Sequence, residues 1–167
     1  MAFWINLYNA TVLQAVLERV RPGFRPNEND RRLFREPRVR VAQRRISLDD
    51  LEQQVIRGLY HDPRVMAALV AGAKSSPPLK PTAWRAHSFD ADLDTAFCAF
   101  VRDPRQNLLD EKARTLRLSR LFESYAPEFR GQADRDSALA RCVGHSLAGY
   151  SVSFREFSWE LNAAPSP

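Results

Sequence analysis

The sequence predicts a single α+β domain that is mostly helical and contains a small β-sheet. Several segments repeat apolar residues with the helical period, and three short segments alternate along the chain like strands. The chain has 167 residues, 44% of them hydrophobic, which is enough for one sizeable core. The domain is expected to span residues 1–162 and to be followed by a disordered tail at 163–167.

The first expected element is a helix over residues 3–20. Its residues are apolar nearly all round, which predicts a buried helix rather than a half-exposed one. Asn6 and Asn9 lie three positions apart and therefore share a face. Because buried amides need partners, these two side chains either tie the helix to a neighbouring backbone or line a pocket.

A basic segment follows, after an irregular connection rich in proline and arginine at residues 21–38. Between Arg31 and Arg45 there are seven arginines and a single acidic residue, Glu36. Residues 38–41 alternate and predict a short strand. Arginines there can contact phosphates, but Phe34 is the one aromatic residue among them and no nucleic-acid motif is present, which argues against nucleic acid as a partner.

The next helix is expected from Ser47 to about Tyr60. Ser47 and Asp50 have the spacing of a reciprocal capping box. The expected core-facing stripe is Leu48, Leu51, Val55 and Leu59. A short helix should then begin at Asp62-Pro63, where proline is tolerated in the first turn, and end near Gly72.

The loop Ser75-Ser76-Pro77-Pro78 cannot be helical, because a residue before proline is held in extended geometry. Its backbone groups are therefore expected to be free to face a ligand. Downstream, a helix is expected over 90–101, with Leu93, Phe97 and Phe100 facing inward. A strand over 115–119, a helix that Ser119 caps, a helix over 135–147 and a closing strand over 150–157 should follow.

Cys98 and Cys142 are too few for a disulfide framework or a metal site. Both lie in helical, apolar segments, so the sequence predicts two buried cysteines that act as small hydrophobic side chains. The net charge of +5 is typical of a solvated surface. Residues 3–20 are too polar for a membrane span and lack the features of a signal peptide. A cytoplasmic location is the default, and an export signal is expected only if an upstream segment is missing.

Residues 144–149, Gly-His-Ser-Leu-Ala-Gly, resemble the nucleophile elbow of esterases. That elbow needs a strand before the serine and a histidine after it. Residues 136–143 instead predict a helix, and no histidine follows Ser146. The segment is therefore expected to be a helix C-terminus, with Gly149 ending the helix.

Three blocks resemble the family called domain of unknown function 547. Residues 62–79, DPRVMAALVAGAKSSPPL, resemble its pattern Asp-Pro-Arg-Ile-His-Phe-Ala-Leu-x-Cys-Gly-Ala-x-Ser-Cys-Pro-Pro-Leu. Residues 2–10, AFWINLYNA, resemble its opening helix, and residues 154–162, FREFSWELN, resemble its closing segment, Tyr-Asp-Trp-x-Leu-Asn. The family usually starts upstream of the first block, so the resemblance also implies an N-terminally truncated sequence.

The departures from this pattern fall on the residues suited to chemistry. Met66 stands where the family has His, Ala71 and Ser76 stand where it has Cys, and Ser158 stands where it has Asp. A His–Cys pair could form an activated thiolate, and this chain has neither partner. The sequence therefore favours a non-catalytic binding or scaffold role, without cofactor or metal, for an unidentified protein or small-molecule partner.

Two alternatives stay open. One is a hydrolase or acyl-transfer enzyme in which Ser76 is the nucleophile, Lys74 polarises an oxyanion, and Asn6 or Asn9 orients the substrate. The other is a pocket for a small anionic ligand. That pocket would be built from Arg64, Lys74 and the backbone amides of Ser75 and Ser76.

Overall fold

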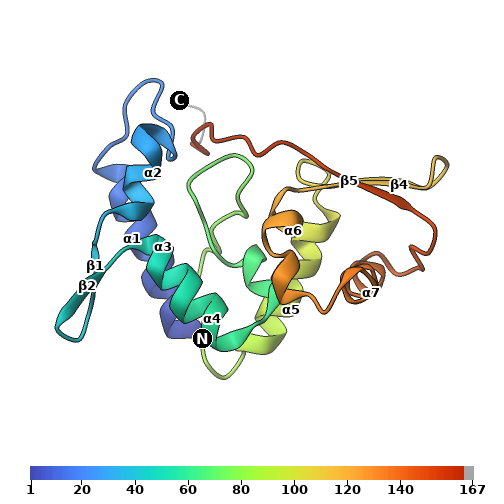
Figure 1. Cartoon of the computed structure of the whole chain (residues 1–167), viewed down its shortest axis with the longest axis horizontal. Helices are drawn as coiled ribbons and strands as arrows, with labels where there is room; N and C mark the ends of the chain where they lie inside the picture. Colours follow the sequence, from blue (N-terminus) through green and yellow to red (C-terminus); the bar gives the residue numbers. More distant parts are fainter. Residues whose placement is uncertain (164–167) are drawn as a thin grey trace. The chain divides into compact units, whose positions relative to one another are not determined.

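The computed structural model describes residues 1–163, which cluster into two compact units (Figure 1). Unit 1 comprises residues 1–61, 69–89 and the segment from Ser158 onward, and unit 2 comprises residues 62–68 and 90–157. Among the described residues, helical segments hold far more residues than strands do, and the strands form two small sheets, which confirms the α+β class. That residues 1–162 form a single domain stays a prediction. Of the tail expected at 163–167, residues 164–167 lie outside the described residues.

Unit 1 is built around helix α1 (Ala2–Leu17). Its core-facing residues recur every three or four positions and are buried together with residues of the next helices: Ile5, Tyr8, Val12 and Ala15, with Leu33, Phe34, Leu48 and Leu51. The prediction of a helix buried all round was wrong. Phe3 is 65% exposed and Leu17 is 73% exposed, because the helical period carries them to the face opposite this stripe.

The helical segment after Ser47 is divided into α3 (Leu48–Asp50), the π-helix η1 (Leu51–Arg57) and α4 (Gly58–Tyr60). The predicted capping box is confirmed, since Ser47 and Asp50 bond each other's backbone N–H groups. The predicted stripe is only partly right. Ile56 is fully buried whereas Leu59 is 67% exposed. In a π-helix each turn holds more residues, so the buried position after Leu51 comes five residues later.

Helix α2 (Glu28–Arg35) contains a left-handed turn at Asn29, Asp30 and Arg31, with φ of 51°, 55° and 57°. The Arg31 guanidinium lies 2.8 Å from the Asp49 carboxylate and over the Phe34 ring. These contacts hold a turn that L-residues rarely adopt in series. This turn was not predicted, although asparagine and aspartate are among the non-glycine residues that adopt left-handed backbone most readily.

A two-stranded antiparallel hairpin follows, formed by β1 (Val39–Val41) and β2 (Arg44–Ile46). The strand expected at residues 38–41 is confirmed within one residue. Its partner β2 was not predicted, because Arg44-Arg45-Ile46 has no apolar alternation. Ala42 adopts a positive φ of 53° in the connecting turn.

Unit 2 combines four helical segments with a three-stranded sheet. The helical segments are η2 (Pro63–Ala67), α5 (Phe89–Arg102), α6 (Leu121–Ser124) with the adjoining η3 (Ala126–Glu128), and α7 (Gln132–Val143). The strands are β3 (Leu108–Asp110), β4 (Thr115–Leu118) and β5 (Ser151–Phe154), in the order β3-β4-β5, where β4 pairs antiparallel with β3 and parallel with β5. The inward residues predicted for α5 are all buried, and Phe97 and Phe100 both contact the Phe122 ring.

Several predicted boundaries in unit 2 need correction. The short helix expected to run to Gly72 ends at Ala67, and α7 ends at Val143, before the expected Leu147. Gly144, with φ of 88°, is the left-handed residue that ends α7, and not Gly149 as expected. Ser146 thus follows a helix and not a strand, which agrees with the rejection of a nucleophile elbow.

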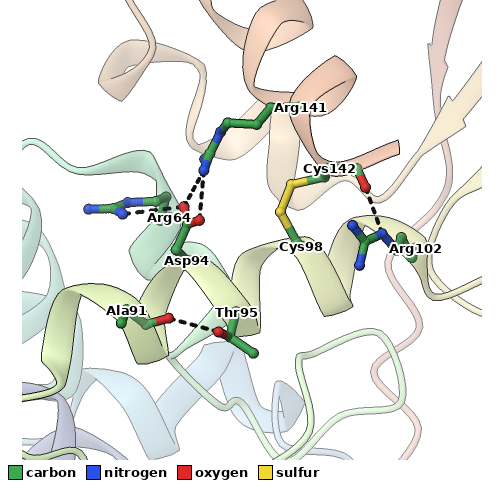
Figure 2. Close-up of a disulfide and its surroundings, with 8 residues drawn as sticks. All are labelled: Arg64, Ala91, Asp94, Thr95, Cys98, Arg102, Arg141 and Cys142. Carbon is green, nitrogen blue, oxygen red and sulfur yellow. Dashed lines mark hydrogen bonds and ion pairs between the residues drawn. A yellow bond between two sulfur atoms is a disulfide. The ribbon is translucent and has the colours of Figure 1, made fainter. Parts of the chain in front are cut away.

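The prediction for the cysteines was wrong. Cys98 of α5 and Cys142 of α7 form a disulfide (Figure 2). Arg141 donates to both oxygens of Asp94 at 2.7 Å, and Arg102 Nε donates to the Cys142 carbonyl oxygen at 2.6 Å. Because the cysteines lie 44 residues apart, only the packing of α7 on α5 brings them together.

Among residues 1–163, no helix combines the length and the apolar character that crossing a membrane requires.

Candidate functional site

Two of the four motif positions, Ser76 and Ser158, lie in segments that pair with each other in unit 1, where the loop of residues 72–76 bonds residues 158–162. The Lys74 amide donates to the Glu160 carbonyl oxygen at 2.8 Å, and the Asn162 amide donates to the Gly72 carbonyl oxygen at 2.8 Å. The Ser158 amide donates to Ser75 Oγ at 2.9 Å. The closing segment therefore clasps the loop that carries Ser76, and we call this pairing the loop clasp.

Ser76 lies inside the loop clasp with only 4% of its surface exposed. Its hydroxyl donates to the Ala73 carbonyl oxygen at 2.8 Å, and its amide donates to the same oxygen at 3.0 Å. A serine needs a base that accepts its proton before it can act as a nucleophile. Here that proton is held by a backbone carbonyl, whose oxygen cannot serve as a general base.

The loop clasp also occupies the groups that were expected to face a ligand. The Ser75 amide donates to the Ser158 carbonyl oxygen at 3.3 Å, and Lys74 Nζ lies 2.6 Å from a Glu160 carboxylate oxygen. The hydrogen bond from Lys74 lowers the pKa of Glu160 below its usual value. The expectation that the backbone of this loop is free for a ligand was therefore wrong, because residues distant in the sequence supply its partners.

Asn6 and Asn9 fasten α1 to two loop segments of unit 1. Asn6 Nδ2 donates to the Trp84 carbonyl oxygen and its Oδ1 accepts from the Trp84 amide, both at 2.9 Å. Asn9 Oδ1 accepts from the Val70 amide at 3.0 Å. Of the two roles that the sequence left open, the structure places both side chains in ties to a neighbouring backbone.

Arg64 belongs to unit 2, where it lies among three aspartates. Its guanidinium is 2.8 Å from Asp62, 2.6 Å from Asp90 and 3.4 Å from Asp94. Figure 2 shows Arg64 and Arg141 both directed at the Asp94 carboxylate. The pKa of Arg64 is raised above its ordinary value, chiefly because its guanidinium donates a hydrogen bond to Asp62. The positive charge expected to hold an anionic ligand is thus balanced within its own unit.

The other motif positions carry no reactive groups. Met66 is buried in the core of unit 2, and the methyl group of Ala71 offers neither a proton nor a lone pair. Across the described residues, 1–163, no three His, Cys, Asp or Glu side chains form a group that could hold a metal ion.

Sequence reasoning missed the acidic partners of Arg64 and the partners of the loop clasp. Asp90 and Asp94 are four residues apart on α5, and this spacing on one helix face was the available signal. No local sequence pattern predicted the loop clasp, because its two segments, residues 72–76 and 158–162, are more than 80 residues apart in the sequence.

The comparison with protein families matches the chain to the model of a family described as "Protein of unknown function, DUF547". The match spans residues 1–101, which is more than half of the chain. The match covers α1, the hairpin, the loop clasp residues 72–76 and most of α5. No curated protein and no solved structure matched the chain. On the strength of the family match, the chain belongs to DUF547, a family of proteins of unknown function.

Proposed function

We propose that this chain is a binding domain that performs no chemistry of its own. The observation that carries the proposal is the Ser76 hydroxyl, which is buried and donates its proton to the Ala73 carbonyl oxygen. At the other three positions where the resemblance implies reactive side chains, the chain has Met66, Ala71 and Ser158. None of these can take a proton from Ser76 at neutral pH.

The remaining groups of the alternative mechanism support the same proposal. Lys74 would have to leave Glu160 to polarise an oxyanion, although this exposed ion pair contributes little to stability. Asn6 would have to give up its partly buried hydrogen bonds to the Trp84 backbone to orient a substrate, and each hydrogen bond lost there costs about 0.5–1.5 kcal/mol. The loop clasp therefore has the properties of a structural fastening.

The proposal predicts that Ser76 carries no catalytic reactivity. The intact chain, Ser76→Ala and Ser76→Cys should all hydrolyse p-nitrophenyl acetate at the rate of the buffer, and a fluorophosphonate probe should not label Ser76. An exposed serine on β5, Ser153, gives the matched control. The Ser153→Cys variant reports the hydrolysis that an unactivated thiol supports by itself.

Saturable hydrolysis by the intact chain that Ser76→Ala abolishes would show that Ser76 is a nucleophile. Hydrolysis by Ser76→Cys well above that of Ser153→Cys would show that the loop still activates a thiolate. Either outcome would replace the binding role with acyl transfer.

We also propose that the domain works in an oxidising compartment and not at the cytoplasmic default. The Cys98–Cys142 disulfide supports this, because thiols in the cytosol of most organisms are kept reduced.

A further inference from the structure

The hairpin β1-β2 carries a concentrated positive charge on a small, exposed sheet. Arg40, Arg44 and Arg45 are all exposed, and we call them the hairpin arginines. Arg40 and Arg45 are direct cross-strand partners, so both side chains leave the same face of the hairpin. Like charges in directly opposite positions destabilise a sheet, which makes this pair costly without an acidic partner.

No acidic side chain of unit 1 compensates the hairpin arginines. Glu36 already binds Arg19 at 2.9 Å and Arg38 at 2.8 Å, and it also pairs with Arg32. Other acids near the hairpin are also engaged: Glu18 pairs with Arg38, Asp30 with Arg35, and Asp49 with Arg31. Asp50 accepts hydrogen bonds from Ser47. Within residues 1–163 the hairpin arginines have no ion pair, so their charge is available to a partner.

A polar recess lies at the base of the hairpin. It has a volume of about 430 Å³ and is lined by Thr11, Gln14, Glu36, Pro37, Arg38 and Arg45. Arg45 thus connects the recess with the charged face that it shares with Arg40. A segment that lies along this face can place one polar side chain in the recess and another against Arg40.

The free edges of the hairpin offer main-chain bonding to the same segment. The sheet consists of β1 and β2 alone, and no third strand pairs with either one in the described part of the chain. In Figure 1 the hairpin extends beyond the helices α1 and α3 of its own unit. Unpaired N–H and C=O groups on such an edge can pair with an added strand.

We infer that Arg40, Arg45 and the recess form a docking surface for an acidic polypeptide segment that adds to the hairpin as a further strand. The inference rests on the proposed binding role and names the class of its partner. Arginine binds carboxylates through paired N–H donors, and charge complementarity selects an acidic sequence. In an added strand with an acidic residue at every second position, all the carboxylates point to the same side of the sheet, which can be the side of Arg40 and Arg45.

The composition of the hairpin favours carboxylates over other anions. Residues 39–46, VRVAQRRI, contain no aromatic side chain on which a nucleic-acid base can stack. They contain no hydroxyl group of the kind that often assists arginine in phosphate binding. They also lack the bulky apolar tip with which a peripheral protein enters a lipid surface.

The test measures binding of a fluorescein-labelled peptide of five Glu-Thr repeats to the intact chain by fluorescence anisotropy. Saturable binding should weaken roughly tenfold in Arg40→Ala/Arg45→Ala, because two exposed ion pairs are lost together. The control variant Arg85→Ala/Arg117→Ala removes the same charge from exposed arginines outside the hairpin and should bind as the intact chain does. A peptide of five Glu-Pro repeats has equal charge but cannot pair as a strand, and it should bind weakly.

Equal loss of binding in both double variants would overturn the docking surface and indicate a response to net charge alone. Equal binding of the Glu-Pro peptide would overturn strand addition. Tighter binding of a single-stranded oligonucleotide or of phosphatidylserine vesicles, at equal charge, would overturn the choice of an acidic polypeptide. Mass spectrometry of the peptide after incubation separates the two proposals: cleavage would refute the non-catalytic role, whereas absence of binding would refute only the docking surface.

Discussion

At the scale of single residues, the polar side chains suited to a binding site bind other parts of the chain. Asn6 satisfies both polar groups of the Trp84 backbone, and Asp94 receives hydrogen bonds from Arg141 and Arg64. The hydrogen bond from Arg141, and secondarily the one from Arg64, lowers the pKa of Asp94 below its ordinary value. This shift links the stability of the chain to pH.

A carboxyl group whose pKa is lower in the folded chain stabilises the fold above its unfolded pKa of about 3.9. That contribution disappears as the pH falls through the folded value. We therefore predict that Asp94→Asn lowers the free energy of unfolding at pH 7 by about 1 kcal/mol or less, since solvent screens a partly exposed ion pair. Between pH 5 and strongly acidic pH, the variant should lose less stability than the intact chain in urea titrations.

Glu156→Gln makes the same charge change at an exposed position of unit 2 and is the control for this prediction. It should leave both the stability at pH 7 and its acid dependence as in the intact chain. If Asp94→Asn retains the full acid dependence, the Arg64–Asp94–Arg141 network does not stabilise the fold.

At the scale of elements, the π-helix η1 decides which side chains enter the core of unit 1. A regular α-helix that buries Leu48 and Leu51 would also direct Val55 toward the core. The observed helix buries Ile56 and exposes Leu59. A substitution pair on this one segment can therefore distinguish the two helix types.

We predict that Ile56→Ala lowers the free energy of unfolding by about 2–5 kcal/mol, because it leaves a cavity in the core. Leu59→Ala is the matched control and should change stability by no more than about 0.5 kcal/mol at its exposed position. Urea denaturation followed by circular dichroism measures both changes. The opposite order of the two effects would show that the segment is a regular α-helix in solution.

At the scale of the whole molecule, one covalent bond joins helices that are distant in the sequence. The Cys98–Cys142 disulfide closes a loop of 44 residues and restricts the unfolded chain. Loss of such a bond commonly costs about 2–5 kcal/mol.

We therefore predict that a reducing agent lowers the melting temperature of the intact chain by roughly 5–15 °C. The double variant Cys98→Ser/Cys142→Ser should melt near the temperature of the reduced chain and should not respond to the reducing agent. Thiol titration under denaturing conditions should find no free thiol before reduction and two afterwards. Two free thiols in the unreduced protein would contradict the bond.

The sequence by itself determined the features that depend on neighbouring residues. The Ser47–Asp50 capping box, the inward stripe of α5, strand β4 and the rejection of the esterase elbow were all predicted, because each depends on residues within a few positions of one another. The resemblance to DUF547 also rested on contiguous motifs, and the family comparison confirmed it.

Tertiary structure alone decided the features that join distant residues. Ser75 meets Ser158, Arg64 meets Asp94, and Cys98 meets Cys142 only after the chain has folded. The same packing uses the Lys74 and Arg64 charges internally and leaves those of Arg40 and Arg45 exposed. Local patterns revealed that the chain is rich in arginine, but which arginines can bind a partner depends on where the folded chain places its carboxylates.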